Sequence, residues 1–564
     1  PGGRYNWSYH SLVAIPFEKE VRADLFAGID KTIEAVCSEN IYAVHLLEEM
    51  GWFGIDICHA GDWHLNKYGI LSGAQDCTLY AIWKASKDCK WSPAAPNIAR
   101  QNATFQRMTG LDMKSSSSWD FEERYIFDRW CRQVSAMAEM AFFEHIKNKY
   151  PGIKCFTWHV IRQEQNPLKS SEASLMATCI DGAVFNPYSS LLSCYYGSFG
   201  PALTLYPNKE IIGVMWGGFD SKNYRHARMT MAYLSGSKGL GFWEGNKTIR
   251  GEGDGAYSDL YPWPAGGQAM DYKVPEIWKL NTAIFKKLSH LPRFDRSHSR
   301  ILLLGETEGG PHTIINAFSG YKSIDIVPPG YEQMIRLLDY DLVIGHLNSF
   351  SDYNYWQNKY GMPGPGLDMR KTEEYVKNGG LLLLSGGAIS QDGKLFLNKY
   401  LFSTKKFQDI ELRYKPEPVL GKKLNLEASY ALELLQRTVK VTKAENIQGD
   451  QFGYLISHGK GYVYYFPLYR NRREKNEQSL QDYRTLLRDL SRGLLELAGK
   501  KSVADKFVCP KGYDFMEVEN KSGSIKCYIW FGGPEFQVKG RDVLSGDKDP
   551  VFGPARRGGI VVRE

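Results

Sequence analysis

Short apolar runs alternate with amphipathic helical patterns along the first half of the chain. Residues 22–37 and 121–149 carry apolar side chains at the i, i+3, i+4 spacing of a helix that packs on one face. The runs that suit strands are 11–17, 41–47, 54–58, 153–158, 182–185, 210–216 and 239–243. Strand–helix–strand repetition predicts a parallel sheet with crossover helices, and these strands suit a (β/α)8 TIM-type barrel of about 250 residues. We therefore expect an α/β barrel domain over 1–298.

A second α/β pattern follows a linker at 291–299. Helices are expected at 371–378 and 479–499, and Asn378-Gly379-Gly380 ends the first of them. The apolar strands are expected at 300–304, 341–345, 380–384 and 461–466. This alternation predicts a doubly wound, flavodoxin/amidotransferase-like domain over 299–503.

The last residues of the sequence change character again. Short strands are expected at 513–518, 524–530 and 559–563, separated by turns rich in Gly, Pro, Asp and Lys. No helical pattern lies between these strands. A small antiparallel β domain over 504–564 is the prediction.

The composition is that of a globular protein, with 43% hydrophobic and 24% charged residues. A net charge of +7 spread over 564 residues, with no basic stripe, predicts no nucleic-acid partner. No apolar run reaches the roughly 20 residues that span a bilayer, so no membrane partner is expected. No leader pattern is visible at 1–10, which fits a cytoplasmic chain or one whose secretory or periplasmic leader has been removed.

Two further counts bear on function. Aromatic residues make up 13% of the chain, which suits a well-filled core or flat platforms for sugar rings. None of the ten cysteines lies in a CxxC pair or at zinc-site spacing, so no zinc site is expected, and the function inferred below implies no metal or organic cofactor. Free, buried cysteines are the favoured interpretation.

Carboxylates, amides and aromatic residues recur where the predicted barrel strands end, and the carboxyl ends of such strands carry the active site. Two adjacent acids, Glu48 and Glu49, follow one strand, and are either solvated surface groups or a general acid at the barrel mouth. The other residues near strand ends are Trp158, His159, Arg162, Glu164, Asn186, Tyr188, Trp216, Asp220, Trp243 and Glu244. Paired acids beside flat rings are what glycosidic cleavage requires.

These motifs resemble glycoside hydrolase family 42 (GH42), the β-galactosidase group. The stretch His45–Gly51, HLLEEMG, is similar to a family stretch that ends Asn-Glu-Tyr-Gly, which implies that Glu49 is the acid/base, with Glu48 in place of the usual Asn. The other stretches that resemble the family are 127–158, 181–188, 225–244, 371–386 and 542–563. The resemblance implies a catalytic barrel, an amidotransferase-like trimerisation domain, a small β domain and therefore a homotrimer.

The sequence departs from the family pattern in two places. The family nucleophile is a Glu that closes the seventh strand, where this sequence has Trp216. Glu244 is our preferred partner carboxylate, while Asp220 is either a second candidate or the cap of the next helix. The match also reaches the family's fourth strand by residue 41, which favours an N-terminally truncated barrel or a shifted strand register.

The resemblance implies a glycoside hydrolase that acts on a β-galactoside or related bond in plant or algal oligo- or polysaccharide. Trp158, Tyr188, Trp216, Trp243 and Trp263 would line sugar subsites. His159, Arg162 and Asn186 would bind hydroxyls or a sulfate, and Glu48 and Glu164 would also contact the substrate. The alternative is a barrel that has lost catalysis and binds carbohydrate. A barrel lyase or isomerase is a third possibility, but His59 and His159 alone do not support it. No Cys follows the strand at 380–384, so glutamine hydrolysis is not expected.

Overall fold

The computed structural model describes many separate segments of the 564-residue chain. Among the described residues, no helix is long and apolar enough to cross a membrane. The described segments are 19–46, 139–159, 179–185, 204, 209–216, 222–234, 236–243, 274–295, 300–304, 324–327, 335–346, 350–351, 366–385, 396–399, 401–414, 424, 430–441, 445–449, 453–466, 468–470, 477–504 and 514–563.

Five strands of the barrel sequence are described. The strands are β1 (Ala43–Val44), β2 (Lys154–His159), β3 (Gly182–Phe185), β4 (Glu210–Trp216) and β5 (Ser237–Trp243). Strands β1 to β3 lie in one compact unit, and β5 with most of β4 lies in the other. The pairs β1–β2, β2–β3 and β4–β5 are parallel, as expected for successive strands of a (β/α) barrel. The predicted strands at 182–185 and 210–216 match β3 and β4, whereas 41–47 contains only the two-residue β1. The runs 11–17 and 54–58 lie outside the described residues.

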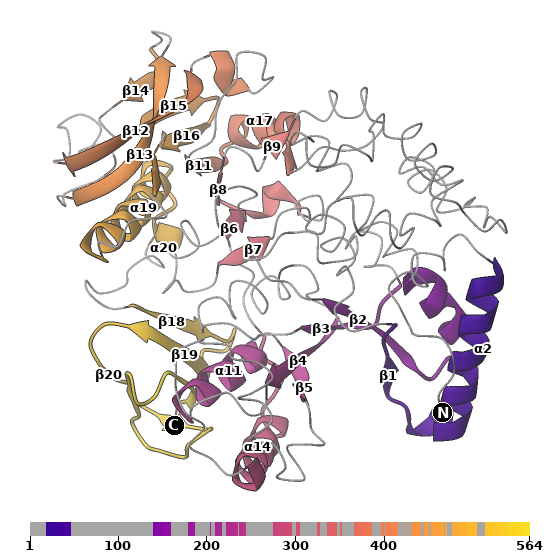
Figure 1. The fold of residues 1–564 in the computed structure, drawn as a ribbon. Helices are drawn as coiled ribbons and strands as arrows, with labels where there is room; N and C mark the ends of the chain where they lie inside the picture. The colour runs from indigo at the N-terminus through magenta and orange to yellow at the C-terminus, as the bar shows by residue number, and fades with distance from the viewer. Residues whose placement is uncertain are drawn as a thin grey trace. The chain divides into compact units, whose positions relative to one another are not determined.

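Amphipathic helices accompany these strands. They are α2 (Lys19–Val36), a helix over 139–149, α11 (Lys222–Leu234) and α14 (Val274–Ser289), with the short 3-10 helix η1 (Ser38–Asn40) after α2. In the first compact unit of the chain, α2 packs beside the helix over 139–149 (Figure 1). The Phe26 ring stacks on His145, with ring centroids 4.5 Å apart, and Ile33 and Phe142 are buried.

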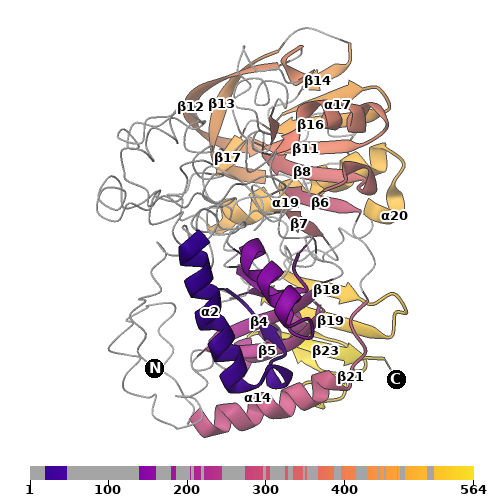
Figure 2. The same ribbon diagram turned by 90° about the vertical axis from the view of Figure 1, so that its right-hand side faces the viewer.

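The second sheet confirms the predicted doubly wound domain. Its parallel strands are β6 (Ile301–Leu304), β7 (Asp325–Val327), β8 (Leu342–His346), β11 (Leu381–Ser385) and β16 (Gly461–Phe466), and β15 (Tyr454–His458) and β14 (Ile447–Gly449) extend it in antiparallel fashion. The order β14-β15-β16-β11-β8-β6-β7 gives the parallel strands the flavodoxin-like order 2-1-3-4-5 (Figure 2).

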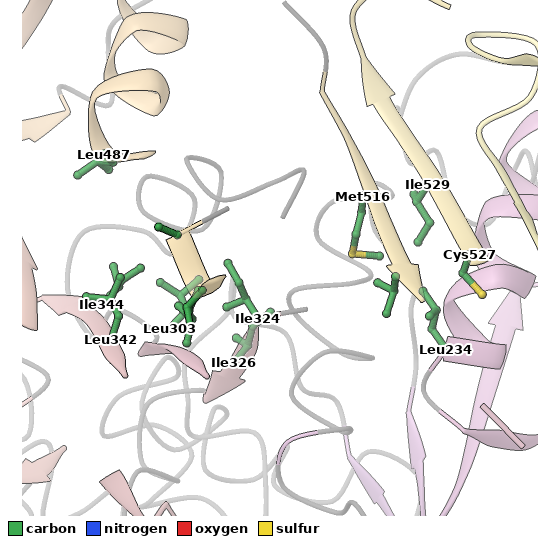
Figure 3. Packing of buried hydrophobic residues seen from close by; sticks show 14 of the residues in the cluster. Leu234, Leu303, Ile324, Ile326, Leu342, Ile344, Leu487, Met516, Cys527 and Ile529 are labelled. Carbon is green, nitrogen blue, oxygen red and sulfur yellow. The ribbon is translucent and has the colours of Figure 1, made fainter. Parts of the chain in front are cut away.

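Helices complete this α/β domain. They are α17 (Met369–Lys377), α19 (Glu477–Leu497), α20 (Lys501–Ala504) and the 3-10 helices η7 (Leu337–Asp339) and η9 (Phe396–Lys399). Asp368 caps α17 by accepting a hydrogen bond from the Arg370 backbone N–H, and Gly379 ends the helix with φ of 103°. Figure 3 shows Leu487 of α19 near Leu303, Leu342 and Ile344 of the sheet, within one buried cluster.

The sequence did not predict a long antiparallel ribbon inside this domain. It consists of β12 (Leu401–Tyr414), β13 (Tyr430–Val441) and β17 (Leu468–Arg470), paired in that order. Its strands mix charged and apolar residues and so lack the apolar signal of a buried strand. A small sheet also pairs β9 (Phe350–Ser351) with β10 (Leu367–Asp368).

The C-terminal residues form the expected antiparallel β module. Its main sheet contains β18 (Asp514–Glu519), β19 (Ile525–Gly532), β23 (Gly558–Val562) and β21 (Arg541–Asp542), and β20 (Phe536–Gln537) pairs with β22 (Val551–Phe552). Met516, Cys527 and Ile529 lie near Leu234 of α11 (Figure 3). A Cβ at Gly558 would stand 2.3 Å from the Ala227 Cα, so β23 lies directly on α11.

A hydrogen bond of 2.7 Å from Lys287 Nζ to the Leu544 carbonyl also ties the C-terminal module to α14. Together with the Gly558–Ala227 contact, it fastens the module to two helices of the barrel sequence. The domain boundaries expected at 298/299 and 503/504 stay predictions.

Candidate functional site

Four predicted site residues stand at the carboxyl ends of described strands. Trp158 and His159 end β2, Trp216 ends β4 and Trp243 ends β5. The structure describes these four residues through their backbone. Parallel pairing places Trp216 opposite Trp243 and His159 opposite Phe185. Trp216 and Trp243 therefore lie next to one another at the carboxyl ends of β4 and β5, the end of a barrel where the active site is found.

The remaining predicted site residues lie outside the described residues, so their predicted roles stay predictions. They include the proposed acid, both candidate partner carboxylates and several sugar-binding residues. These are Glu48, Glu49, Arg162, Glu164, Asn186, Tyr188, Asp220, Glu244 and Trp263.

A buried polar contact joins the carboxyl end of β2 to the helix over 139–149. The Thr157 hydroxyl lies 2.9 and 3.1 Å from the two carboxylate oxygens of Glu139, to which it donates, and both residues are fully buried. On the same side of the strand, the Cys155 Sγ lies 3.9 Å from the Phe143 carbonyl of the same helix. Residues 155 and 157 therefore face the helix over 139–149, and strand alternation assigns residue 156 to the other face.

Sequence reasoning missed Glu139. A glutamate in an amphipathic helix is ordinarily a solvated residue, and nothing local distinguishes this one. Its position within the apolar run AMAEMAFF at 136–143 does not by itself separate a buried glutamate from a solvated one.

The opposite face of β2 is filled by aromatic packing. The Phe156 ring lies edge-on to Tyr42, with centroids 6.3 Å apart. A Cβ at Gly182 would stand 2.6 Å from the Phe156 ring, so glycine is required where β3 passes this side chain. This packing holds β2 against Tyr42 and against β3, on the amino-terminal side of Trp158 and His159.

The ion pairs of this sheet are at the amino ends of the strands. Lys154 Nζ lies 2.7 Å from a Glu210 carboxylate oxygen, and the Tyr42 hydroxyl donates to the same carboxylate. Hydrogen bonds with Glu210 and Tyr42 raise the pKa of Lys154 above its usual value. Because the active site of such a barrel lies at the carboxyl ends of its strands, we assign this cluster at the amino ends to the stability of the sheet.

The described residues also bear on two other site types. Within the described segments, no group of three His, Cys, Asp or Glu residues is arranged to hold a metal ion. In the doubly wound domain, β11 ends at Ser385, which is 4% exposed. The strand therefore ends in a buried serine where an amidotransferase would need a reactive cysteine.

Comparison of the structure with solved structures decides the fold. A β-galactosidase from Bacillus circulans sp. alkalophilus superposes with a TM-score of 0.54 at 13% identity, covering 89% of this chain and 76% of that chain. A GH42 β-galactosidase from G. stearothermophilus gives 0.52 at 12% identity, covering 89% and 75%. A β-galactosidase from the Antarctic haloarchaeon Halorubrum lacusprofundi gives 0.51 at 11% identity, covering 89% and 75%.

The chain has the GH42 β-galactosidase fold. This confirms the fold class expected from the sequence resemblance, a barrel followed by a doubly wound domain and a small β domain. No protein-family model matches the sequence, and no curated protein sequence matches it. The likeness to the GH42 fold is therefore one of architecture, and the reaction is argued in the next subsection.

Proposed function

We propose that this protein is a glycoside hydrolase that cleaves a β-galactoside or related glycosidic bond in plant or algal oligo- or polysaccharide. The GH42 fold, which extends over 89% of the chain, is the observation that carries the proposal. The pairing of Trp216 with Trp243 across β4 and β5 supports the proposal, because neighbouring aromatic residues suit the stacking of sugar rings. No cofactor takes part in the proposed reaction.

Two carboxyl groups perform the proposed chemistry. Glu49 protonates the leaving glycosidic oxygen as general acid, and Glu244 acts as the partner carboxylate, with Asp220 as the second choice. A separation of about 6.5–9.5 Å between the two groups admits a water molecule and gives inversion, whereas about 5–5.5 Å gives a covalent intermediate and retention. The configuration of the first product therefore reports the arrangement of the acids.

A carbohydrate-binding protein without catalysis is the second candidate. Strand β4 ends at Trp216, at the position where the family resemblance leads one to expect a nucleophilic Glu. An aromatic residue there can bind a sugar but cannot attack an anomeric carbon. This candidate needs rings at the strand ends and no paired acids.

Product analysis separates the two candidates. Purified protein is incubated with galactose-, mannose- and fucose-containing oligosaccharides, including sulfated ones, and proton NMR follows the first anomer formed. Glu49→Gln should abolish turnover and retain sugar affinity, while Glu39→Gln, at an exposed position outside the predicted site, should retain the wild-type activity. Product formation that survives in Glu49→Gln would remove Glu49 from its proposed role, and sugar binding without turnover by the wild type would favour the binding protein.

The assembly expected from the resemblance is a homotrimer formed through the doubly wound domain. Light scattering coupled to size-exclusion chromatography measures the mass directly. A particle three times the 64.1 kDa of the chain supports the trimer, and a monomer or dimer at micromolar concentration contradicts it.

A further inference from the structure

The carboxyl group of Glu139 is fully buried on the helix over 139–149. Glu139 and Thr157 are both 0% exposed, and the adjacent Phe142 and Phe143 are 2% and 0% exposed. The Thr157 hydroxyl donates to this carboxylate at 2.9 Å. Transfer of a carboxylate from water to such a place costs several kcal/mol unless its partners compensate.

An apolar side chain of similar volume would serve the packing of this helix at lower cost. Natural sequences retain such locally unfavourable choices mainly where a functional site requires them. The location of the Glu139–Thr157 pair is therefore informative.

The Glu139–Thr157 pair lies close to the carboxyl end of β2, on the side of the strand that faces the helix over 139–149. Thr157 is followed by Trp158 and His159, the last two residues of the strand. One turn further along the helix, the Phe143 carbonyl lies 3.9 Å from Cys155 Sγ, so the helix is fastened to β2 at two successive positions of one face. The contact nearer the end of the strand is the one made by the Glu139 carboxyl group, and it is adjacent in sequence to the predicted sugar-binding residues Trp158 and His159.

We propose that Glu139 is a positioning residue of the candidate site. Through Thr157 it holds the carboxyl end of β2 and so fixes the backbone position of Trp158 and His159. This inference rests on the proposed function, because it assigns Glu139 to the same sugar-binding edge. Supporting residues of this kind matter because a displacement of about 1 Å at a reacting group can cost about 100-fold in rate.

Three variants test the pair. Thr157→Val removes the hydroxyl at nearly constant volume, Thr157→Ser retains it, and Glu139→Gln removes the charge at constant shape. We expect Thr157→Val to lower kcat/KM about tenfold or more, and Thr157→Ser to remain within about twofold of the wild type. The Glu139→Gln/Thr157→Val double variant should have the same kcat/KM as Thr157→Val, because the two residues act as one unit.

A matched control comes from the doubly wound domain. The Tyr340 hydroxyl donates to the buried Asp325 carboxylate at 2.9 Å, so Tyr340→Phe removes the same type of contact outside the site. It should lower the melting temperature and leave kcat/KM unchanged. If Thr157→Val behaves like Tyr340→Phe, with a lower melting temperature and an unchanged kcat/KM, the role of Glu139 is only structural and the proposal is overturned.

A measurement without substrate separates this proposal from the proposed function. Residue-resolved hydrogen–deuterium exchange compares Glu139→Gln and Thr157→Val with the wild type. We expect faster exchange at the amides of Trp158 and His159 and unchanged exchange at Cys155. Unchanged exchange at all three overturns the proposal. A wild type that neither cleaves nor binds any glycoside refutes the proposed function, while the exchange result still decides the role of Glu139.

Discussion

Trp216 and Trp243 stand at the same register position, at the carboxyl ends of the neighbouring parallel strands β4 and β5. Matched positions of a parallel pair lie side by side across the sheet. The pairing of β4 with β5 therefore places these two aromatic positions next to one another, although they are distant along the sequence.

Replacement of either tryptophan should weaken sugar binding. A lost ring–sugar contact of roughly 1–1.5 kcal/mol corresponds to a Kd about tenfold higher for Trp216→Ala or Trp243→Ala. Titration calorimetry with the best oligosaccharide measures the change. Trp530→Phe, which alters a buried tryptophan of the C-terminal module, is the control and should leave the Kd unchanged. Wild-type affinity in both alanine variants would mean that these residues do not contact sugar.

Asp341 should stabilise the doubly wound domain in a pH-dependent way. Arg300 donates two hydrogen bonds of 2.7 Å to its carboxylate, and Lys500 Nζ lies 2.9 Å away. Burial by itself raises the pKa of Asp341, but the hydrogen bonds from Arg300 and Lys500 outweigh it and hold the pKa below its usual value.

Because the folded-state pKa is lowered, this stabilisation is fully present above the unfolded value of about 3.9 and disappears as the pH falls through the folded pKa. Asp341→Asn should cost about 2 kcal/mol at pH 7, less than a fully buried pair would lose, since half of the Arg300 side chain is in solvent. Urea unfolding at pH 7 and at pH 3 measures the difference, which should shrink at the lower pH. A difference that is equal at both pH values would contradict this assignment.

A methyl group at position 558 should separate β23 from α11. The added Cβ would stand 2.3 Å from the Ala227 Cα, a distance that requires backbone movement. We expect Gly558→Ala to lower the free energy of unfolding by roughly 1–3 kcal/mol. Gly152→Ala introduces the same methyl group where no atom lies within 4 Å, and should change stability by less than about 0.5 kcal/mol. Equal stability of the two variants would show that the module is not held by this contact.

The described cysteines should differ in reactivity. Burial raises the pKa of the Cys155 and Cys179 thiols to about 12, and the pKa of buried Cys527 is also raised by burial. Because the thiolate is the reactive form, native protein at pH 8 should resist iodoacetamide at these positions, whereas exposed Cys37 should react. Peptide mapping by mass spectrometry detects the labelled positions. Rapid native labelling of Cys155 or Cys527 would contradict their burial.

The sequence predicts the buried strands of this fold more reliably than its other elements. The runs 182–185, 210–216 and 461–466 match β3, β4 and β16, because each is an apolar run bounded by turn residues. The three-residue β7 is too short to leave a periodic signal. The strands β12 and β13 pair with one another over most of their length. Such pairing between two polar strands cannot be recognised from the residue pattern of either strand alone.

Some residues of the candidate site could be predicted from the sequence, and others could be found only in the structure. Residues at strand ends, such as Trp216 and Trp243, could be predicted because a strand boundary is a local property of the sequence. Their shared register follows from the pairing of β4 with β5 and needed the structure. Glu139 could not be predicted, since its partner Thr157 and its burial arise only when the helix packs on β2.

The contact between β23 and α11 has a consequence for biosynthesis. Ala227 and Gly558 are separated by more than half of the chain, and contacts between such distant segments form late and slowly. On the ribosome, the apolar side of α11 therefore remains uncovered until residues 514–562 have been made. An incomplete chain therefore exposes apolar surface of the kind that makes folding intermediates prone to aggregation, and this contact can form only after β23 has been synthesised.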